Sequence, residues 1–73
     1  MQVLSSLNVG QLAVIDQINV SNQKKIKLLG LGINTGASIS ILRNRRGDMV
    51  IAMGNARISV GKTLASLIKV REL

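Results

Sequence analysis

The feature that most restricts how this chain can fold is the absence of large rings and thiols, since it contains no Phe, Tyr, Trp or Cys. Its core must therefore be built from aliphatic side chains and methionine, without a disulfide or a zinc–thiolate site to stabilise it. The chain of 73 residues has room for one domain, which we place at residues 1–73. A domain of this size buries only roughly 60% of the surface of its unfolded chain, so a large enclosed active site is not expected.

Short strands separated by tight turns are predicted over most of the chain. We expect strands at residues 12–20, 38–43, 49–53, 56–60 and 68–71. The alternation of polar and apolar residues from Ser38 to Arg43 is the clearest of these patterns, because a half-buried strand needs a period of two. Gly54-Asn55 predicts a hairpin whose type II′ turn begins with glycine, and residues 44–48 are expected to form a polar loop.

One longer helix and one short helical turn are predicted between the strands. Ser21 or Asn22 is a good N-cap, and the helix that follows carries Ile26, Leu29 and, as a third candidate, Leu28 at helical spacing. Gly32 is expected to lie at the C-terminal cap, while Gly30 indicates either close packing or an early helix end. The short helical turn is expected at residues 62–67.

This order of elements predicts a mainly β fold, a small antiparallel barrel of about five strands, with one helix after the first strand and a short helix before the last. Closing the sheet into a barrel removes exposed strand edges, and small aliphatic residues suit its narrow interior. An open α+β packing is the alternative.

The charge of the chain favours an acidic partner. Ten Lys and Arg residues against three Asp and Glu residues give a net charge of +7. Nucleic acid, an anionic membrane surface and an acidic protein face each fit this charge. The absence of aromatic residues argues against binding modes in which bases stack on rings, but not against contacts to a phosphate backbone.

Two glycine-rich segments resemble nucleotide-binding motifs and fail on inspection. Val60-Gly61-Lys62-Thr63 looks like the end of a P-loop, but Ala56 stands where that motif requires its first glycine. The glycines of residues 30–36 follow a predicted helix, whereas a dinucleotide fingerprint follows a strand and opens a helix. We interpret the first segment as the start of the short helix and the second as a helix stop.

Neither a metal site nor catalytic residues can be assigned. The chain has no His, and its three carboxylates, Asp16, Asp48 and Glu72, are far apart in sequence, so no cofactor or intrinsic metal is expected. No nucleophile–base pair has a recognisable spacing, so we predict a binding protein and not an enzyme. Met49 and Met53 lie four residues apart in a predicted strand and are interpreted as fillers of the core.

The basic residues fall into three groups along the chain. These are Lys24, Lys25 and Lys27 on the helix, Arg43, Arg45 and Arg46 near a hairpin loop, and Arg57 with Lys62 further on. Each group is either a solvated surface or part of a docking site for an acidic partner. The scarcity of carboxylates that could neutralise them favours the second interpretation.

With these elements in place, residues 25–39, KIKLLGLGINTGASI, resemble the signature of the FeoA family of bacterial ferrous iron uptake. Members show a basic helix, a Leu-Gly-Leu step, a tight turn and an alternating strand. Residues 54–60 look like the short hairpin of that family, and residues 65–70 look like its closing helix and strand. Thr35 stands where the family usually has a proline before the glycine, and the lack of aromatics is less typical.

The resemblance implies an SH3-like barrel in the cytoplasm that assists FeoB, a membrane transporter with a cytoplasmic GTPase domain. It further implies docking of the basic helix and loop on an acidic face of that domain, with Leu28 and Leu31 at the centre of the contact. The partner-binding residues expected on this basis are Lys24, Lys25, Lys27, Leu28, Leu31, Arg43, Arg45, Arg46 and Arg57. Contact with the membrane would be indirect, through the transporter, and self-association is left open.

Two rival functions remain at this stage. Domains of this type also resemble the C-terminal part of iron-dependent repressors, but no helix-turn-helix is recognised and a stand-alone role is expected. A basic barrel that binds nucleic acid through phosphates is the second rival. The N-terminus does not resemble a signal peptide, and no apolar run approaches the roughly 18 residues of a membrane span, so a cytoplasmic location is expected.

Overall fold

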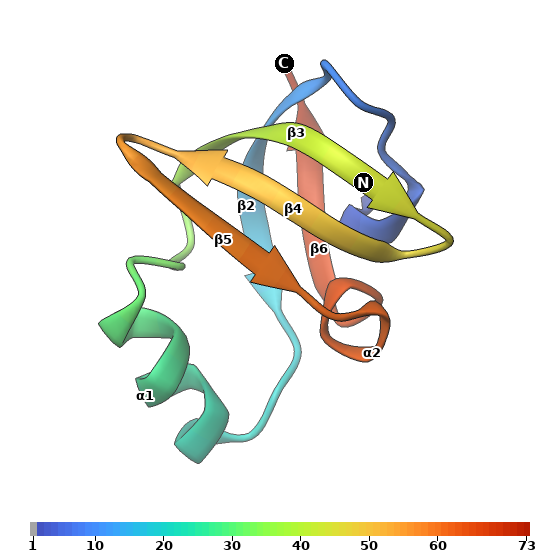
Figure 1. The fold of residues 1–73 in the computed structure, drawn as a ribbon. Helices are drawn as coiled ribbons and strands as arrows, with labels where there is room; N and C mark the ends of the chain where they lie inside the picture. The colour runs from blue at the N-terminus through green and yellow to red at the C-terminus, as the bar shows by residue number, and fades with distance from the viewer. Residues whose placement is uncertain (1) are drawn as a thin grey trace.

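The computed structural model describes residues 2–73, which form one mainly β fold with six antiparallel strands in a single sheet (Figure 1). The strands are β1 (Gln2–Val3), β2 (Leu12–Ile18), β3 (Ser38–Arg45), β4 (Asp48–Met53), β5 (Ala56–Val60) and β6 (Ile68–Glu72). They are ordered β1-β6-β2-β3-β4-β5 across the sheet. The predicted fold class is confirmed, and the additional strand is β1, whose two residues pair with Lys69 and Val70 of β6.

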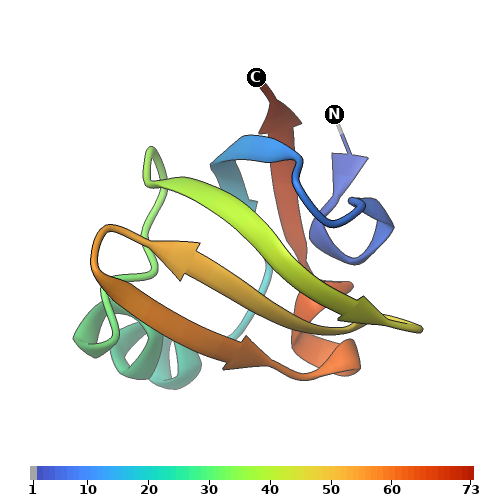
Figure 2. The same cartoon turned by 45° about the horizontal axis from the view of Figure 1, so that its top comes forward.

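The sheet bends over itself without closing. Irregularities in pairing lie between Ile15 and Gln17 of β2 and between Ile41 and Arg43 of β3, where an extra residue allows a strand to bend. As a result β3, β4 and β5 cross in front of the β2–β6 pair (Figures 1 and 2). Strands β1 and β5 remain the two edges of the sheet, so the expectation that a closed barrel removes the exposed edges is wrong.

Two tight turns join the strands of the β3–β4–β5 meander. Gly54 has a φ of 60°, and the φ of Asn55 is not positive. A type II′ turn requires this combination, so the predicted turn is confirmed. Arg46 and Gly47 both have positive φ, 52° and 97°, which is the geometry of a type I′ turn. The predicted loop at residues 44–48 is thus a two-residue turn, and β3 extends to Arg45.

Helix α1 (Asn22–Gly30) begins and ends with well-defined caps. The Ser21 hydroxyl accepts a hydrogen bond from the Lys24 N–H at 3.4 Å, which confirms the predicted N-cap. At the other end the N–H of Ile33 donates to the Leu28 carbonyl and that of Gly32 to the Leu29 carbonyl, both at 2.9 Å. This is a Schellman motif, with Gly32 at a φ of 86° in its left-handed position.

The core is aliphatic, as the composition requires. Ile33 follows the Schellman turn and is buried, while a Cβ on Gly30 would contact nothing within 4 Å, so that glycine marks an early helix end and not close packing. Met49 is buried and Met53 packs against the core, which confirms their interpretation. The buried residues are Leu4, Leu7, Ala13, Ile15, Leu28, Ile33, Ile39, Ile41, Met49, Ile51, Ile58, Val60, Ala65, Ile68 and Val70.

Candidate functional site

Helix α1 is anchored to the domain by one of its own residues. Leu28 is 5% exposed, and the other eight residues of the helix are exposed. The Schellman motif explains this orientation, because the residue three positions before its cap and the residue two positions after it, here Leu28 and Ile33, face the same apolar region. Leu28 therefore belongs to the core and cannot be at the centre of a docking contact, which corrects the sequence-based assignment.

Three large aliphatic side chains near α1 lie on the surface instead. Ile26 is 69% exposed, Leu29 52% and Leu31 57%. The sequence pattern put Ile26, Leu29 and Leu28 at helical spacing without deciding which of them faces the core, and in the structure Leu28 alone of the three is buried. The signal that could have decided this is the pair Leu28 and Ile33 on either side of the Gly32 stop.

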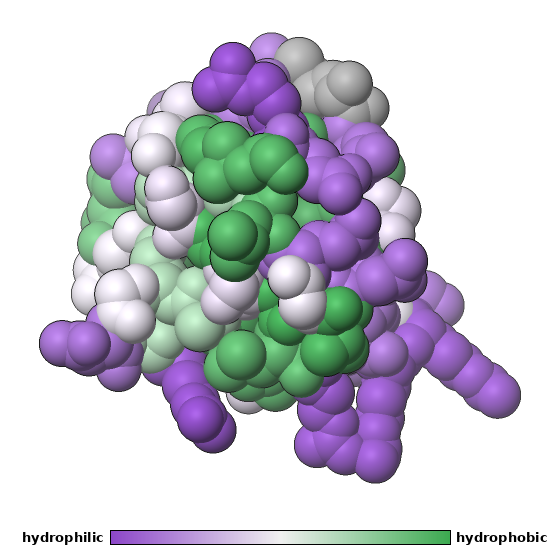
Figure 3. All heavy atoms as spheres, turned by 90° about the horizontal axis from the view of Figure 1, so that it is seen from above, coloured by the Kyte–Doolittle hydropathy of each residue, from purple (hydrophilic) through white to green (hydrophobic). Residues whose placement is uncertain are grey.

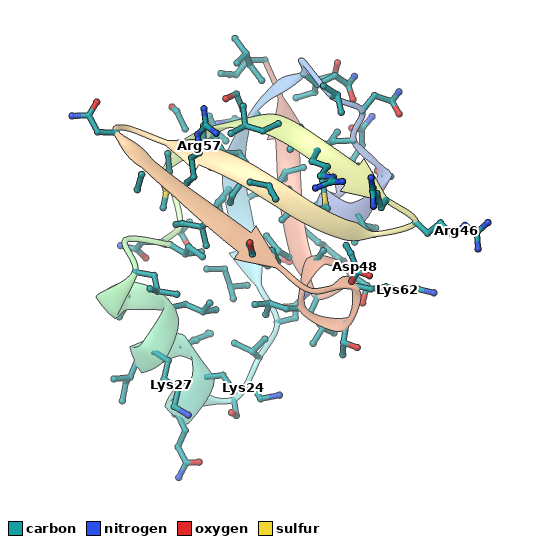
Figure 4. The ribbon with its side chains drawn as sticks, viewed as in Figure 1. Lys24, Lys27, Arg46, Asp48, Arg57 and Lys62 are labelled. Carbon is teal, nitrogen blue, oxygen red and sulfur yellow. The ribbon has the colours of Figure 1, made fainter. Side chains whose placement is uncertain are left out.

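The predicted lysines lie on the same helix as these aliphatic residues. Lys24, Lys25 and Lys27 are all exposed on α1, which carries no acidic residue, and Figure 4 shows Lys24 and Lys27 on it. Two of the three carboxylates of the chain accept hydrogen bonds from other segments, although Asp48 lines the same hollow as Lys24. Asp48 accepts a hydrogen bond from the Lys62 backbone N–H at 2.8 Å, and Glu72 accepts one from the Gln11 side-chain amide at 2.7 Å. We call the exposed surface of the helix and its C-cap, formed by Ile26, Leu29, Leu31, Lys24, Lys25 and Lys27, the α1 face; Lys25 and Leu29 line a hollow beside Ile18, and Lys24 lies on the side toward α2.

The predicted arginines divide between two places. Arg43 and Arg45 lie two residues apart on β3 and are exposed, as is Arg57 on β5, so all three project from the outer side of the β3–β4–β5 meander. Small residues separate them. Val50 of β4 is paired with Arg43, and Ala52 is paired with Arg57. We call the surface formed by Arg43, Arg45 and Arg57 the arginine face; Asp48, paired with Arg45, is the acidic residue at its end.

Arg46 is separated from the arginine face although it is adjacent in sequence. It occupies the first position of the type I′ turn, and its side chain points away from the sheet at the tip of the β3–β4 hairpin, whereas Arg57 lies near the other end of the meander (Figure 4). The α1 face lies on yet another side of the domain, below β5 in Figure 4. The basic residues predicted to bind a partner thus lie on two separate surfaces, with Arg46 apart from both and lining a hollow with Lys62.

The segment that resembles a P-loop has a structural role. Gly61 is the N-cap of α2 (Lys62–Ala65), so the short helix begins at Lys62 as predicted but ends at Ala65, before the predicted end at residue 67. The Lys62 side chain packs over the type I′ turn, because a Cβ on Gly47 would lie 2.9 Å from Lys62 Cγ. Lys62 therefore joins α2 to the β3–β4 hairpin.

A hollow of about 660 Å³ lies between the N-terminal 3-10 helix (Leu4–Ser6), the β3–β4 turn and α2. Asn44, one of several polar side chains that line it, is hydrogen-bonded within the fold through both its amide N–H groups and its oxygen. The Asn44 amide donates to the Ser5 carbonyl at 3.0 Å and to the Leu7 carbonyl at 2.7 Å, and its oxygen accepts from the Gly47 N–H at 2.9 Å. These bonds tie the N-terminal segment to the hairpin and leave no free group on Asn44 for a ligand.

The end of the molecule that carries the C-terminus shows a second apolar surface. Figure 3 displays a group of hydrophobic atoms there, bordered by hydrophilic residues. Leu12 and Leu73, 54% and 70% exposed, line one shallow hollow together with Ile39 and Ala52. This C-terminal patch lies at the opposite end of the domain from α1 (Figure 1).

Within residues 2–73, no group of three or more His, Cys, Asp or Glu side chains is placed to hold a metal ion. Over the same residues, none of the helices has the length and apolar character needed to cross a membrane. The exposed features that remain as candidate sites are therefore the α1 face, the arginine face and the C-terminal patch.

The family model of the FeoA domain, which describes the sequences of that family, matches residues 2–72 of the chain. A "Putative Fe(2+) transport protein A" of Methanocaldococcus jannaschii is 26% identical over 72 residues, which are 99% of this chain and 88% of that protein. The crystal structure of an iron uptake regulatory protein (FeoA) has a TM-score of 0.89 and 30% identity, covering 97% of this chain and 96% of that one. A manganese-dependent transcriptional repressor shares the fold, with a TM-score of 0.89 and 21% identity over 99% of this chain and 41% of the repressor. The SH3-like fold implied by the resemblance is confirmed.

Proposed function

The chain belongs to the FeoA family, and from this premise we propose that it is a small cytoplasmic accessory protein of ferrous iron uptake. It acts by binding a FeoB-type membrane transporter at the cytoplasmic GTPase region. The observation that supports the proposal is the α1 face, where three large aliphatic side chains are exposed on and next to a helix that carries three lysines and no acidic residue.

The energetics of the α1 face suit a reversible protein contact. Full burial of one Leu or Ile side chain is worth about 1.5–3 kcal/mol, and each of Ile26, Leu29 and Leu31 has about half or more of its surface still to bury. Apolar residues at the centre of an interface with charged residues at its rim are the usual arrangement for specific binding. The α1 face carries both kinds of residue, because Ile26 and Leu29 are neighbours one turn apart on the helix and Lys25 and Lys27 flank Ile26 in sequence.

Charge gives the direction of the encounter. With a net charge of +7, the domain is attracted to an acidic protein surface over several ångströms, and such steering raises the association rate more than it slows dissociation. The aliphatic residues act after contact, by slowing dissociation. The lysines and aliphatic residues of the α1 face therefore predict separate kinetic effects.

The proposal is tested by binding the protein to its FeoB-type transporter, reconstituted in nanodiscs and immobilised on a biosensor. We expect Leu31→Ser to raise the dissociation rate about tenfold, and Lys24→Glu with Lys27→Glu to lower mainly the association rate. Leu73→Ser, which changes an even more exposed leucine on the C-terminal patch, is the control and should bind like the wild type. Equal loss of binding in the Leu31 and Leu73 variants would show that the α1 face is not the docking site.

The arginine face supports one alternative, a barrel that binds nucleic acid through its phosphates. Three arginines on one open sheet surface could contact adjacent phosphates without stacking on bases. For binding of that kind, the logarithm of the association constant falls linearly with the logarithm of salt concentration. The slope on duplex DNA is about −0.9 for each phosphate neutralised. Salt titrations with a random DNA duplex and with the transporter distinguish the two functions.

A further inference from the structure

Strand β5 has an edge with no partner. It pairs only with β4, and it ends the strand order of the sheet. Met53 and Ala56 flank the two-residue turn and form a hydrogen-bonded pair, so the alternation of an antiparallel ladder turns the N–H and C=O groups of Arg57 and Ser59 away from β4. Both residues are exposed. The edge therefore offers two donors and two acceptors at the spacing of a strand.

This edge lacks the features that usually prevent pairing with another chain. Short length, proline, bulges and several charged residues are the common protections of an edge strand. β5 has five residues in continuous register with β4, and the chain contains no proline. Arg57 is its single charged residue. The other edge of the sheet, β1, is only two residues long and is thus protected by its length.

Helix α1 lies beside the free edge and adds positive charge to it. At one end of β5, Lys24 and Gly61 line the same hollow, of about 490 Å³. At the other end, a Cβ on Gly32 would lie 3.5 Å from Cε of Met53, the last residue before the β4–β5 turn. Figures 1 and 2 both place α1 below β5. A strand added to this edge would therefore have Arg57 on its outer side and Lys24 of α1 near one end, where Asp48 lines the same hollow.

We propose that the free edge of β5 binds an extended acidic segment of a partner protein as an additional strand. Backbone groups of Arg57 and Ser59 would pair with the segment, and its side chains on the outer surface would be Asp or Glu opposite Arg57. Side chains on the inner surface would be aliphatic, because Ile58 and Val60 face the core on that side. A second copy of this chain is disfavoured as the occupant, since it would bring together two net charges of +7.

The probe is a synthetic octapeptide of alternating Glu and Val, titrated into isotope-labelled protein and followed by NMR. We expect the amides of Arg57 and Ser59 to shift and to exchange with solvent about tenfold more slowly in the complex. Arg57→Glu should weaken binding about three- to tenfold. Arg71→Glu, which reverses an exposed arginine on β6, is the matched control and should have a smaller effect.

A peptide methylated on alternate backbone nitrogens separates strand pairing from simple charge attraction without altering the protein. Loss of binding on methylation supports the proposal. Equal binding of both peptides, shifts confined to the lysines of α1, or no binding at millimolar peptide would overturn it. Any of these results would leave docking of the transporter through the aliphatic residues of the α1 face unaffected, so the two proposals fail separately.

Discussion

The orientation of α1 can be tested by truncating the buried leucine of the helix and comparing it with an exposed neighbour. Leu28 is 5% exposed and packs in the core, whereas Ile26 is 69% exposed. Leu→Ala changes in protein cores cost about 2–5 kcal/mol, with the smaller values where the surroundings can collapse into the cavity. Because Leu28 is the one buried residue of α1, the helix can shift inward, and we expect Leu28→Ala to cost about 2–3 kcal/mol.

A loss of this size is large for a domain of 73 residues, whose expected stability is about 4–11 kcal/mol. Since 1 kcal/mol shifts the midpoint temperature of thermal unfolding of a domain of this size by about 4–8 °C, Leu28→Ala should lower that temperature by roughly 10–20 °C. Ile26→Ala should change stability by less than about 0.5 kcal/mol, because its side chain is mostly in water in the folded state as well.

Guanidinium chloride unfolding followed by far-UV circular dichroism is the suitable assay, because the chain has no aromatic residue for fluorescence. The slope of free energy against denaturant should be the same for both variants and the wild type, which makes their midpoints comparable. A larger loss for Ile26→Ala than for Leu28→Ala would refute the assignment of the inner and outer sides of α1, and with it the α1 face.

Three further changes test other parts of the fold by the same unfolding assay. Gly32→Ala should cost about 1 kcal/mol or more, because the Schellman position has a φ of 86°; no loss would contradict this cap. Asn44→Ala should cost about 2–3 kcal/mol, since it leaves two carbonyls and one N–H of the hairpin junction unpaired; a neutral result would mean that water replaces these bonds. Gly47→Ala should cost about 1–2 kcal/mol through its φ of 97° and the contact with Lys62, and Lys62→Ala should recover part of this cost in the double variant. Additive effects would show that the two side chains do not meet.

Local patterns predicted the elements that depend on neighbouring residues. Alternation predicted β3, Gly54-Asn55 predicted the type II′ turn, and Ser21 and Gly32 predicted the two caps of α1. Each of these rests on backbone chemistry within a few residues, so it does not require knowledge of the tertiary fold.

Features that depend on long-range packing were not predicted. β1 has two residues, too few for a periodic pattern, and exists because β6 offers it an edge. The inner side of α1 was left undecided because Ile26, Leu28 and Leu29 are all strongly apolar, and only the path of the chain after Gly32 decides which one is buried. Arg46 was grouped with its neighbours because a type I′ turn with arginine in its first position is not a usual sequence pattern.

The candidate site was predicted in part, for the same reason. The exposure of Lys24, Lys25 and Lys27 follows from their charge. That Leu31 is exposed while Leu28 is buried follows from the C-terminal turn of the helix. The free edge of β5 could not be predicted, because a closed barrel and an open sheet contain the same strands and differ only in whether the two edge strands pair with each other.

The central claim, docking of this FeoA-family protein on a FeoB-type transporter through the α1 face, is tested most directly by affinity purification from its own cells. The tagged wild type and the Leu31→Ser variant are each captured at moderate salt from detergent-solubilised, nuclease-treated lysate, and retained proteins are identified by mass spectrometry. We expect the transporter with the wild type and at least about tenfold less with the variant. Equal recovery of the transporter with both proteins would contradict the account. A parallel capture from lysate without nuclease that retains nucleic acid in place of the transporter would contradict it as well.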